Sequence, residues 1–310
     1  MASPSALPRA GEGGRPRRRP RSAVQRGLRM LPVVPSIVLL LLFLLAPVLW
    51  SFYASFTDAS LSGRGARDPQ WTGLDNYARM LGDSSFPLSA WLTLVFVVAS
   101  AILGQNLLGL VIALLMTRAR GPVSSVVGIA VVASWVLPEI VAAFAAYAWF
   151  SKDGTLNQLL APVGAGGTNW LYSFPLMAIV LANIWRGTAF SMLVYRAALA
   201  EVPQDISEAA LVDGARGWQR LLFVTVPLIR SSIATNLMLI TLQTLAVFTL
   251  IWVMTAGGPA NASTTLPVLA YQEAFKFGDI GYGTAIASVL ILIGVVFGAA
   301  YVWLLREKRP

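Results

Sequence analysis

Long apolar stretches alternate along this chain with short polar segments. A helix that crosses a bilayer needs about twenty mostly apolar residues. Six stretches meet this requirement: 31–56, 89–116, 123–150, 175–199, 231–256 and 283–305. Prolines at positions 32, 35 and 47 in the first stretch, and at position 138 in the third, predict kinks or shifted boundaries. The pattern therefore predicts an all-α integral membrane protein with six transmembrane helices.

A polar, charged loop of about thirty residues, 200–230, lies between the fourth and fifth stretches. Within it, Asp205, Glu208 and Asp213 are followed by Arg216, Arg220 and Arg230. Helix dipoles favour acids toward the N-terminal end and cations toward the C-terminal end. We expect the chain to turn at Gly214 and the second helix to end at Pro227, so the loop should form a short helix, a turn and a second short helix. We expect a membrane loop with this much structure to be a docking surface.

Composition narrows the possible chemistry. Only 12% of the 310 residues are charged, whereas soluble domains have about a quarter. The chain has no cysteine and no histidine, which removes thiolate chemistry, the commonest general base and the commonest metal ligand. None of its lysines is followed by Ser or Thr, as a phosphate-binding loop requires. We therefore expect no catalytic residue, no metal site and no ATPase site in this chain.

Basic residues are concentrated at the N-terminus and in alternate loops. Eight of the 23 lie in the first thirty positions, among Pro and Gly, which predicts a disordered basic tail over 1–30 that contacts anionic membrane lipid and no nucleic acid. A cleaved signal peptide fits less well, because the apolar run that follows is too long. With this tail inside, cytoplasmic segments hold 17 basic residues and outer loops hold five. This bias predicts that both termini, including residues 306–310, and the 200–230 loop are cytoplasmic.

The 200–230 loop also resembles a known signature. Glu208-Ala209-Ala210, then Gly214, then Val224-Thr-Val-Pro227 has the spacing of the Glu-Ala-Ala signature in permease subunits of binding-protein-dependent ABC importers. The signature's Ile and Leu positions are both Val here. Trp71–Tyr77 and the stretch from Thr255-Ala-Gly-Gly-Pro259 to Gly283 resemble outer loops of carbohydrate permeases. The resemblance covers most of residues 31–305 and points to the maltose-transporter type.

This resemblance implies an architecture and a set of partners. Residues 31–305 would form a type I ABC importer transmembrane domain in a prokaryotic cell membrane. The partners would be a second homologous permease, two ATPase subunits that bind ATP and Mg, and an extracytoplasmic solute-binding protein. The chain itself would be a transport subunit without enzyme activity. Its substrate would be a mono- or oligosaccharide.

The resemblance assigns the 200–230 loop as the coupling loop. Its coupling helix would enter the ATPase through Glu208, Ala209, Ala210, Asp213 and Gly214. The two alanines make the helix thin, and Glu208 offers a carboxylate to a partner's arginine. Glycine permits the reversal of the chain. The alternative is an interfacial loop stabilised only by ion pairs one helical turn apart.

Polar residues inside membrane spans are functional candidates by default. Aligned with the maltose-type permease, the substrate-binding positions are Asn183, Trp185, Arg186, Gly187 and Phe190 in the fourth span, and Gln243, Thr244 and Val247 in the fifth. Amide and guanidinium donors suit sugar hydroxyls, and an aromatic face suits a pyranose ring. Two positions depart from that relative, which has an apolar residue in place of Arg186 and a polar one in place of Val247.

Packing offers an alternative for several of these residues. Asn183 and Gln243 could bond neighbouring helices, and Trp185 could simply pack. Arg186 could pair with Glu139, contact substrate or extend toward a membrane surface. We expect Gln105 and Asn106 in packing or at a subunit interface. Small residues suit close helix contacts, and we interpret them as support for assembly with a second permease: Ala99, Gly104, Gly109, Ala113, Gly294 and Gly298.

Two alternative functions remain open at this point. The same machinery could carry a glycerol-phosphate-type or other small polar solute, for which Arg186 would be suited. An ion-coupled secondary transporter would need carboxylates inside the spans, and Glu139 is the one acid placed there. A membrane-embedded enzyme is more remote, because histidine, cysteine and a convincing acid–base pair are missing.

Overall fold

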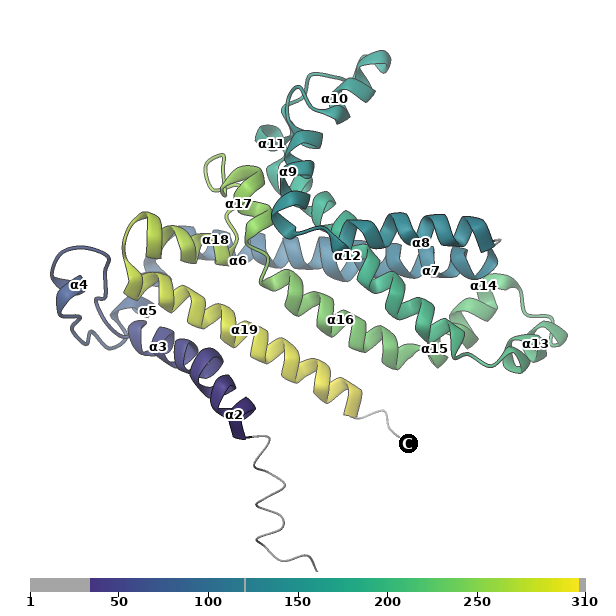
Figure 1. Ribbon diagram of the computed structural model, residues 1–310, viewed down its shortest axis with the longest axis horizontal. Coiled ribbons are helices and arrows are strands. Elements are labelled where there is room, and N and C mark those ends of the chain that lie inside the picture. Colours follow the sequence, from purple (N-terminus) through teal and green to yellow (C-terminus); the bar gives the residue numbers. More distant parts are fainter. Residues whose placement is uncertain (1–33, 120, 307–310) are drawn as a thin grey trace, which may run out of the picture. The chain divides into compact units, whose positions relative to one another are not determined.

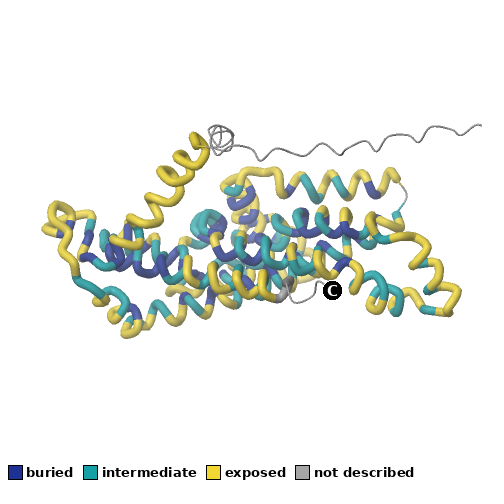
Figure 2. The backbone as a smooth tube through the Cα atoms, turned by 90° about the horizontal axis from the view of Figure 1, so that it is seen from below, coloured by how far each residue is buried: buried dark blue, intermediate teal, exposed yellow. Residues whose placement is uncertain are grey.

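The computed structural model describes residues 34–119 and 121–306, so the predicted basic tail and the last four residues lie outside it. The chain divides into two units at residues 50 and 51. The described part of the first unit contains α2 (Val34–Leu40), π-helical η2 (Leu41–Leu45) and the start of α3 (Ala46–Ala54). Every residue from 34 to 50 is exposed, as Figure 2 shows. An apolar helix exposed all round suits lipid.

Within the residues that the structure describes, four helices are long and apolar enough to cross a membrane unbroken. They are Val34–Ala54, Ser85–Arg118, Pro175–Ala200 and Ile280–Trp303. The second comprises α6 (Ser85–Phe96), π-helical η3 (Val97–Gln105) and α7 (Asn106–Arg118), while the others include α12 (Pro175–Ala200) and α19 (Ile280–Arg306). These helices confirm the first, second, fourth and sixth predicted spans.

The third predicted span is broken near its middle. Helices α8 (Gly121–Val136) and α9 (Glu139–Phe150) meet at residues 137–138, and the two helical segments joined there bend by 106°. Pro138 precedes the first residue of α9, where its missing N–H and fixed φ are tolerated. The expected kink is therefore confirmed, but a single helix over 123–150 is wrong.

The fifth predicted span, 231–256, is also interrupted. Helix α16 (Arg230–Leu245) ends before residues 246–248, and α17 (Thr249–Thr255) follows. The N–H groups of Ala246 and Val247 bond to carbonyls three residues back, at 3.3 and 3.1 Å, which ends the α-helical pattern. Before α16, a 72° bend separates it from a segment made of α14 (Gly217–Arg220), η5 (Leu221–Thr225) and α15 (Val226–Leu228).

Helix α12 is central to the second unit. It contacts α7, η3, α8 and α16 in the bundle that Figure 1 shows. A β-carbon on Gly104 or Gly109 would lie 2.3 or 2.5 Å from side-chain atoms of Ile184 and Ser191 on α12. Both glycines therefore serve a contact within this chain, which corrects their interpretation as subunit-assembly residues.

Small side chains also join α9 to α12, and larger side chains of α17 pack in the same cluster. Ala143 and Ala146 of α9, Ala178 and Ala182 of α12, and Ile251 of α17 belong to one buried cluster. Alanines let the helix backbones approach closely. The two half-helices that follow the breaks are thus packed on the same central helix.

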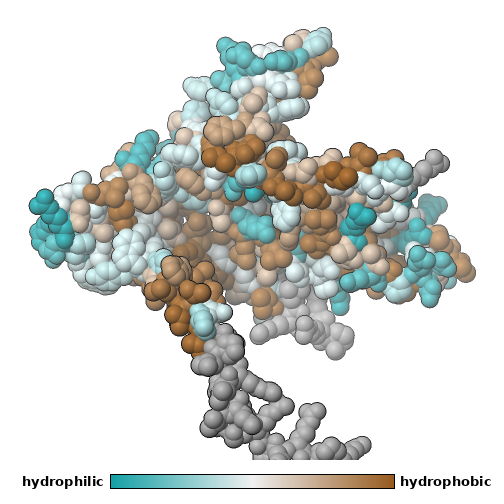
Figure 3. Space-filling model, in the orientation of Figure 1, coloured by the Kyte–Doolittle hydropathy of each residue, from teal (hydrophilic) through white to brown (hydrophobic). Residues whose placement is uncertain are grey.

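Short helices connect the long ones. They are α4 (Arg64–Arg67), α5 (Asp75–Gly82), α10 (Thr155–Leu160), 3₁₀-helical η4 (Ala161–Val163), α11 (Trp170–Ser173), α13 (Gln204–Val212), α18 (Leu266–Tyr271) and π-helical η6 (Gln272–Lys276). Figure 3 shows hydrophilic surface at the ends that carry α4 and α13, with broad hydrophobic surface between them. This distribution suits a molecule that crosses a bilayer.

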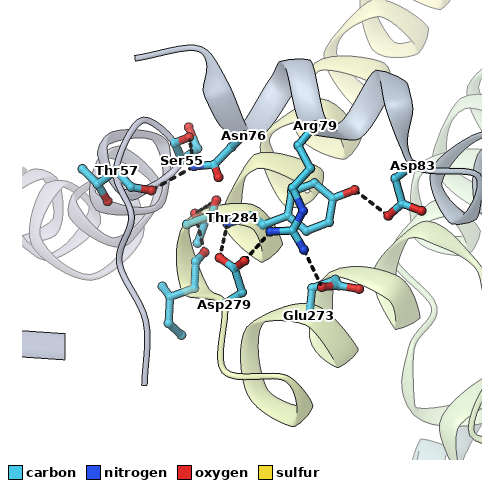
Figure 4. A network of polar contacts seen from close by, with 11 residues as sticks. Ser55, Thr57, Asn76, Arg79, Asp83, Glu273, Asp279 and Thr284 are labelled. Atoms are coloured by element: carbon cyan, nitrogen blue, oxygen red, sulfur yellow. Dashed lines mark hydrogen bonds and ion pairs between the residues drawn. The ribbon is translucent and has the colours of Figure 1, made fainter. Parts of the chain in front are cut away.

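A group of charged and aromatic side chains ties α5 to η6 and the start of α19. This polar clasp consists of Arg79, Asp83, Glu273 and Asp279, which Figure 4 labels, together with Tyr282. The Arg79 guanidinium lies 2.5 Å from Asp279 and 3.8 Å from Glu273, and the Tyr282 hydroxyl donates to Asp83 at 2.8 Å. The clasp fixes two segments separated by about two hundred residues.

Burial and hydrogen bonding have opposite effects on two acids of the clasp. Burial raises the pKa of Glu273, because Arg79 at 3.8 Å compensates only partly for lost water. Burial would also raise the pKa of Asp83, but hydrogen bonds from the Ser85 N–H and the Tyr282 hydroxyl hold that pKa below its usual value.

Candidate functional site

The 200–230 loop has the predicted helix–turn–helix form. Helix α13 ends at Val212, and Gly214 follows with φ +76°, in the left-handed region that favours glycine. The Gly214 N–H bonds to the Leu211 carbonyl and the Ala215 N–H to the Ala210 carbonyl, both at 3.0 Å. This pair of bonds is a Schellman cap. Pro227 lies inside α15 and the bend comes at Ile229, so the predicted stop at Pro227 is displaced.

The predicted coupling residues lie at the surface. Glu208, Ala209, Asp213 and Gly214 are exposed, and Ala210 is half-buried. The adjoining apolar residues Leu211 and Val212 are 54% and 89% exposed. Among the described residues, no ion pair involves the acids and bases of this loop. Backbone hydrogen bonds therefore hold the loop in this form. The ion pairs that the alternative interpretation requires are not found among the described residues.

Figure 1 shows where this surface lies in the second unit. Helix α13 projects at one end, beyond α14 and α15. The Arg216 N–H donates to Gln219 Oε1 at 2.8 Å and so caps α14. A capped, projecting helix end with apolar and acidic side chains can enter a complementary groove.

Two of the predicted substrate residues on α12 face inward. Asn183 is 3% exposed, and its Nδ2 donates to Ser100 Oγ at 2.8 Å. Its carbonyl accepts a bond from Gln105 Nε2 at 3.1 Å. A β-carbon on Gly187 would lie 2.2 Å from Gln105 Oε1. Asn183 and Gly187 therefore shape the contact between α12 and η3. Gln105 packs between these helices, which is one of the two roles predicted for it.

Two aromatic residues of α12 have different surroundings. Trp185 is 46% exposed and lines a mainly apolar cavity of about 530 Å³ with Trp149, Phe150 and Leu181. The Phe190 ring packs against Trp135 with centroids 6.0 Å apart. Of these two side chains, Trp185 is the one that lines a cavity.

Arg186 lies beside Glu139, the first residue of α9. Arg186 Nη2 and Glu139 Oε2 are 3.9 Å apart, which confirms the pairing alternative. Each side chain is partly exposed, yet Arg186 Nε and Glu139 Oε1 are buried without a hydrogen-bond partner. The pair is thus in contact but incompletely bonded.

The fifth-span residues lie around the end of α16. Gln243 is exposed, whereas Thr244 and Val247 are buried. Helix α16 packs on α12, but in the described part of the chain no hydrogen bond or ion pair joins these three residues to those predicted on α12.

Asn106, expected in packing or at a subunit interface, belongs to a polar network inside the bundle that the sequence did not reveal as a network. Asn106 Oδ1 accepts bonds from Tyr195 and from Asn236, and Asn236 also donates to Ser191 at 3.1 Å. Polar residues on three apolar stretches were the available signal. Their partners could not be identified because helix neighbours are not visible in a single sequence.

The helical bundle and its projecting loop define a multi-pass membrane transport component. Residues 105–310 match the family described as binding-protein-dependent transport system inner membrane component, and this chain belongs to that family. The predicted family, type I permease fold and membrane location are confirmed by this match and by the similarities below.

Several characterised proteins are similar over nearly the whole chain. The trehalose/maltose transport system permease protein MalF of Thermococcus litoralis is 32% identical, with 91% of this chain and 95% of that protein covered. The sulfoquinovosyl glycerol transport system permease protein SmoG of Agrobacterium fabrum is 33% identical, with 91% and 92% covered. A chain of a bacterial ABC transporter that imports the acidic polysaccharide alginate has the same fold, with a TM-score of 0.79, 20% identity and 93% and 98% coverage.

Proposed function

We propose that this chain is one permease subunit of a sugar-importing ABC transporter and forms half of the translocation pathway. The observation that carries the proposal is the exposed, Schellman-capped helix α13, which bears the Glu-Ala-Ala signature. The names of the similar permeases, which include trehalose/maltose and sulfoquinovosyl glycerol systems, support a sugar as substrate.

Helix α13 would couple this chain to a separate ATPase. Glu208, Ala209, Ala210, Asp213 and Gly214 form the docking surface, and ATP and Mg bind to the partner. The transporter would contain a second permease, two ATPase subunits and an extracytoplasmic binding protein. A structure of the alginate transporter with its periplasmic protein supports the last of these by analogy. The termini, the 1–30 tail and α13 would then lie on the cytoplasmic side.

The substrate would contact residues on the α12 and α16 sides of the pathway. Trp185, Arg186 and Gln243 are accessible and supply an aromatic face and hydrogen-bond donors. The remaining predicted positions would support these three side chains from within the protein: Asn183, Gly187, Phe190, Thr244 and Val247.

Purification from the native membrane, followed by reconstitution in vesicles, tests the proposal. An ATPase subunit and a second permease should co-purify with this chain. Labelled sugar should enter the vesicles only with ATP and the binding protein. Uptake driven by an ion gradient without any ATPase would overturn the proposal.

A further inference from the structure

We infer that Glu139 is a substrate-contacting residue, and that a hydroxyl of an uncharged sugar bridges Glu139 and Arg186 in the translocation pathway. This inference rests on the proposed function and adds a residue and a substrate class to it. It is carried by the geometry of the pair and by the break in the helix that precedes Glu139.

The separation of the two charged groups leaves room for a bridging atom. Arg186 Nη2 and Glu139 Oε2 lie 3.9 Å apart, beyond direct hydrogen-bond distance. A hydroxyl oxygen about 2.8 Å from each atom would make two bonds that meet at roughly a right angle. The two facing atoms are not buried without a partner; within this pair, the buried atoms without a partner are Glu139 Oε1 and Arg186 Nε.

The neighbouring break indicates that this face lines an aqueous cavity. Leu137 and Pro138, between α8 and α9, are exposed and non-helical. Irregular backbone at membrane depth is tolerated only where it is buried in protein or lines a cavity. An exposed charge pair facing lipid would also be costly. In transporters, interrupted helices whose half-helix ends face the pathway commonly form the substrate site.

The chemistry of the pair selects a hydroxyl. A hydroxyl can accept a bond from the guanidinium and donate one to the carboxylate at the same time. A sulfonate or carboxylate has no proton to donate and would be repelled by Glu139. The Glu139 charge is itself favoured by its position at the N-terminus of α9, a twelve-residue helix. The pair therefore favours a neutral polyhydroxylated group.

A single cysteine tests access to the site, because the natural chain has none. In the intact transporter, Glu139→Cys should react with a small water-soluble thiol reagent, measured as a mass shift of this chain. A saturating neutral disaccharide that the wild type imports should slow this reaction. Ala143→Cys, at a fully buried position of the same helix, is the control and should stay unlabelled. An unreactive Glu139→Cys would overturn the inference, as would a Glu139→Cys protein that still imports a neutral sugar but is not protected by it.

Uptake in vesicles separates this inference from the proposed function. The probes are trehalose, maltose and lactose as neutral sugars and sulfoquinovosyl glycerol as an anionic one. Glu139→Leu should lower the maximal uptake rate of a neutral sugar about tenfold or more, because a charge-assisted bond is lost. Asp68→Asn, at an exposed loop position, should leave the rate unchanged. Preferred import of the sulfonated sugar, or an unchanged rate in Glu139→Leu, would contradict this inference alone. If none of the four probes is imported in the presence of ATP, the result would contradict the proposed sugar transport.

Discussion

Glu208 stands on an exposed helix in a loop where no described residue pairs with it, which makes its charge available to a partner. We expect Glu208→Lys to reduce ATP-driven uptake at least tenfold, since it replaces an attraction with repulsion at the coupling surface. Membrane insertion should be unaffected. Uptake in vesicles and the amount of inserted protein are the measurements, with Glu201→Lys, also exposed, as the matched control. Equal losses in the two variants would argue against a specific role for Glu208.

Gly187 and Gly298 are both glycines within long helices, but their surroundings differ. A β-carbon on Gly187 would lie 2.2 Å from Gln105 Oε1, whereas one on Gly298 would meet nothing within 4 Å. We expect Gly187→Ala to destabilise the protein by about 1–3 kcal/mol through overpacking. Gly298→Ala should be neutral or slightly stabilising. Thermal unfolding in detergent compares them, and Gln105→Ala should restore much of the loss in the Gly187→Ala protein.

Some residue roles were readable from the sequence and others were not. The spacing around Glu208 identified the loop, and the left-handed Gly214 followed from its position after the helix. Asn183 was singled out correctly as a polar residue in a span, but its partner Ser100 lies 83 positions away. That pairing depends on which helices are neighbours, so the spacing of residues along one segment cannot reveal it.

The polar clasp has a pH dependence that can be worked out for one acid. Glu273 binds its proton more tightly in the folded than in the unfolded protein, because burial raises its pKa. Its ionised form therefore lowers stability at neutral pH, and stability declines as pH rises through the folded pKa. Glu273→Gln should raise the midpoint of thermal unfolding at pH 7. The difference from wild type should shrink as the pH falls below that pKa.

The other acid of the clasp supplies the control for that experiment. Hydrogen bonds hold the pKa of Asp83 below its usual value, so its contribution is present at neutral pH and is lost on acidification. Asp83→Asn should therefore lower the midpoint of thermal unfolding at pH 7. It should also reduce the loss of stability that accompanies acidification. The same sign of effect in both variants would show that the clasp acts in some other way.

At the scale of elements, apolar runs located the spans, and only some prolines marked breaks: Pro35 and Pro47 lie inside the unbroken helix Val34–Ala54. Pro138 marked the interruption of the third span. The sequence predicted a kink there, whereas the structure shows two separate helical segments at an angle of 106°. No proline or glycine lies between Leu245 and Thr249, so the second break had no local signal. There Val247 is buried and Phe248 packs against the cluster shared by α9, α12 and α17, which only the folded bundle brings together.

The whole molecule presents two faces whose partners should differ. Val212 on α13 and Leu159 on α10 are both strongly exposed apolar residues, at 89% and 62%. We expect Val212→Cys to crosslink to the ATPase subunit in the intact transporter, because that residue lies beside the proposed docking surface. Leu159→Cys should not form this product, since α10 would lie on the opposite side of the membrane. Mass spectrometry of the crosslinked products would identify the partner, and an ATPase adduct at Leu159→Cys would contradict the proposed orientation.

The alanine-rich packing of α9 and α17 on α12 constrains how the molecule can move. Each half-helix is separated from the preceding one by a non-helical joint, at residues 137–138 and 246–248. Because alanines of α9 and larger apolar side chains of α17 share one buried cluster, neither half-helix can tilt alone without opening a void. We therefore expect the two half-helices to move together, so that a displacement at either joint also displaces the other half-helix.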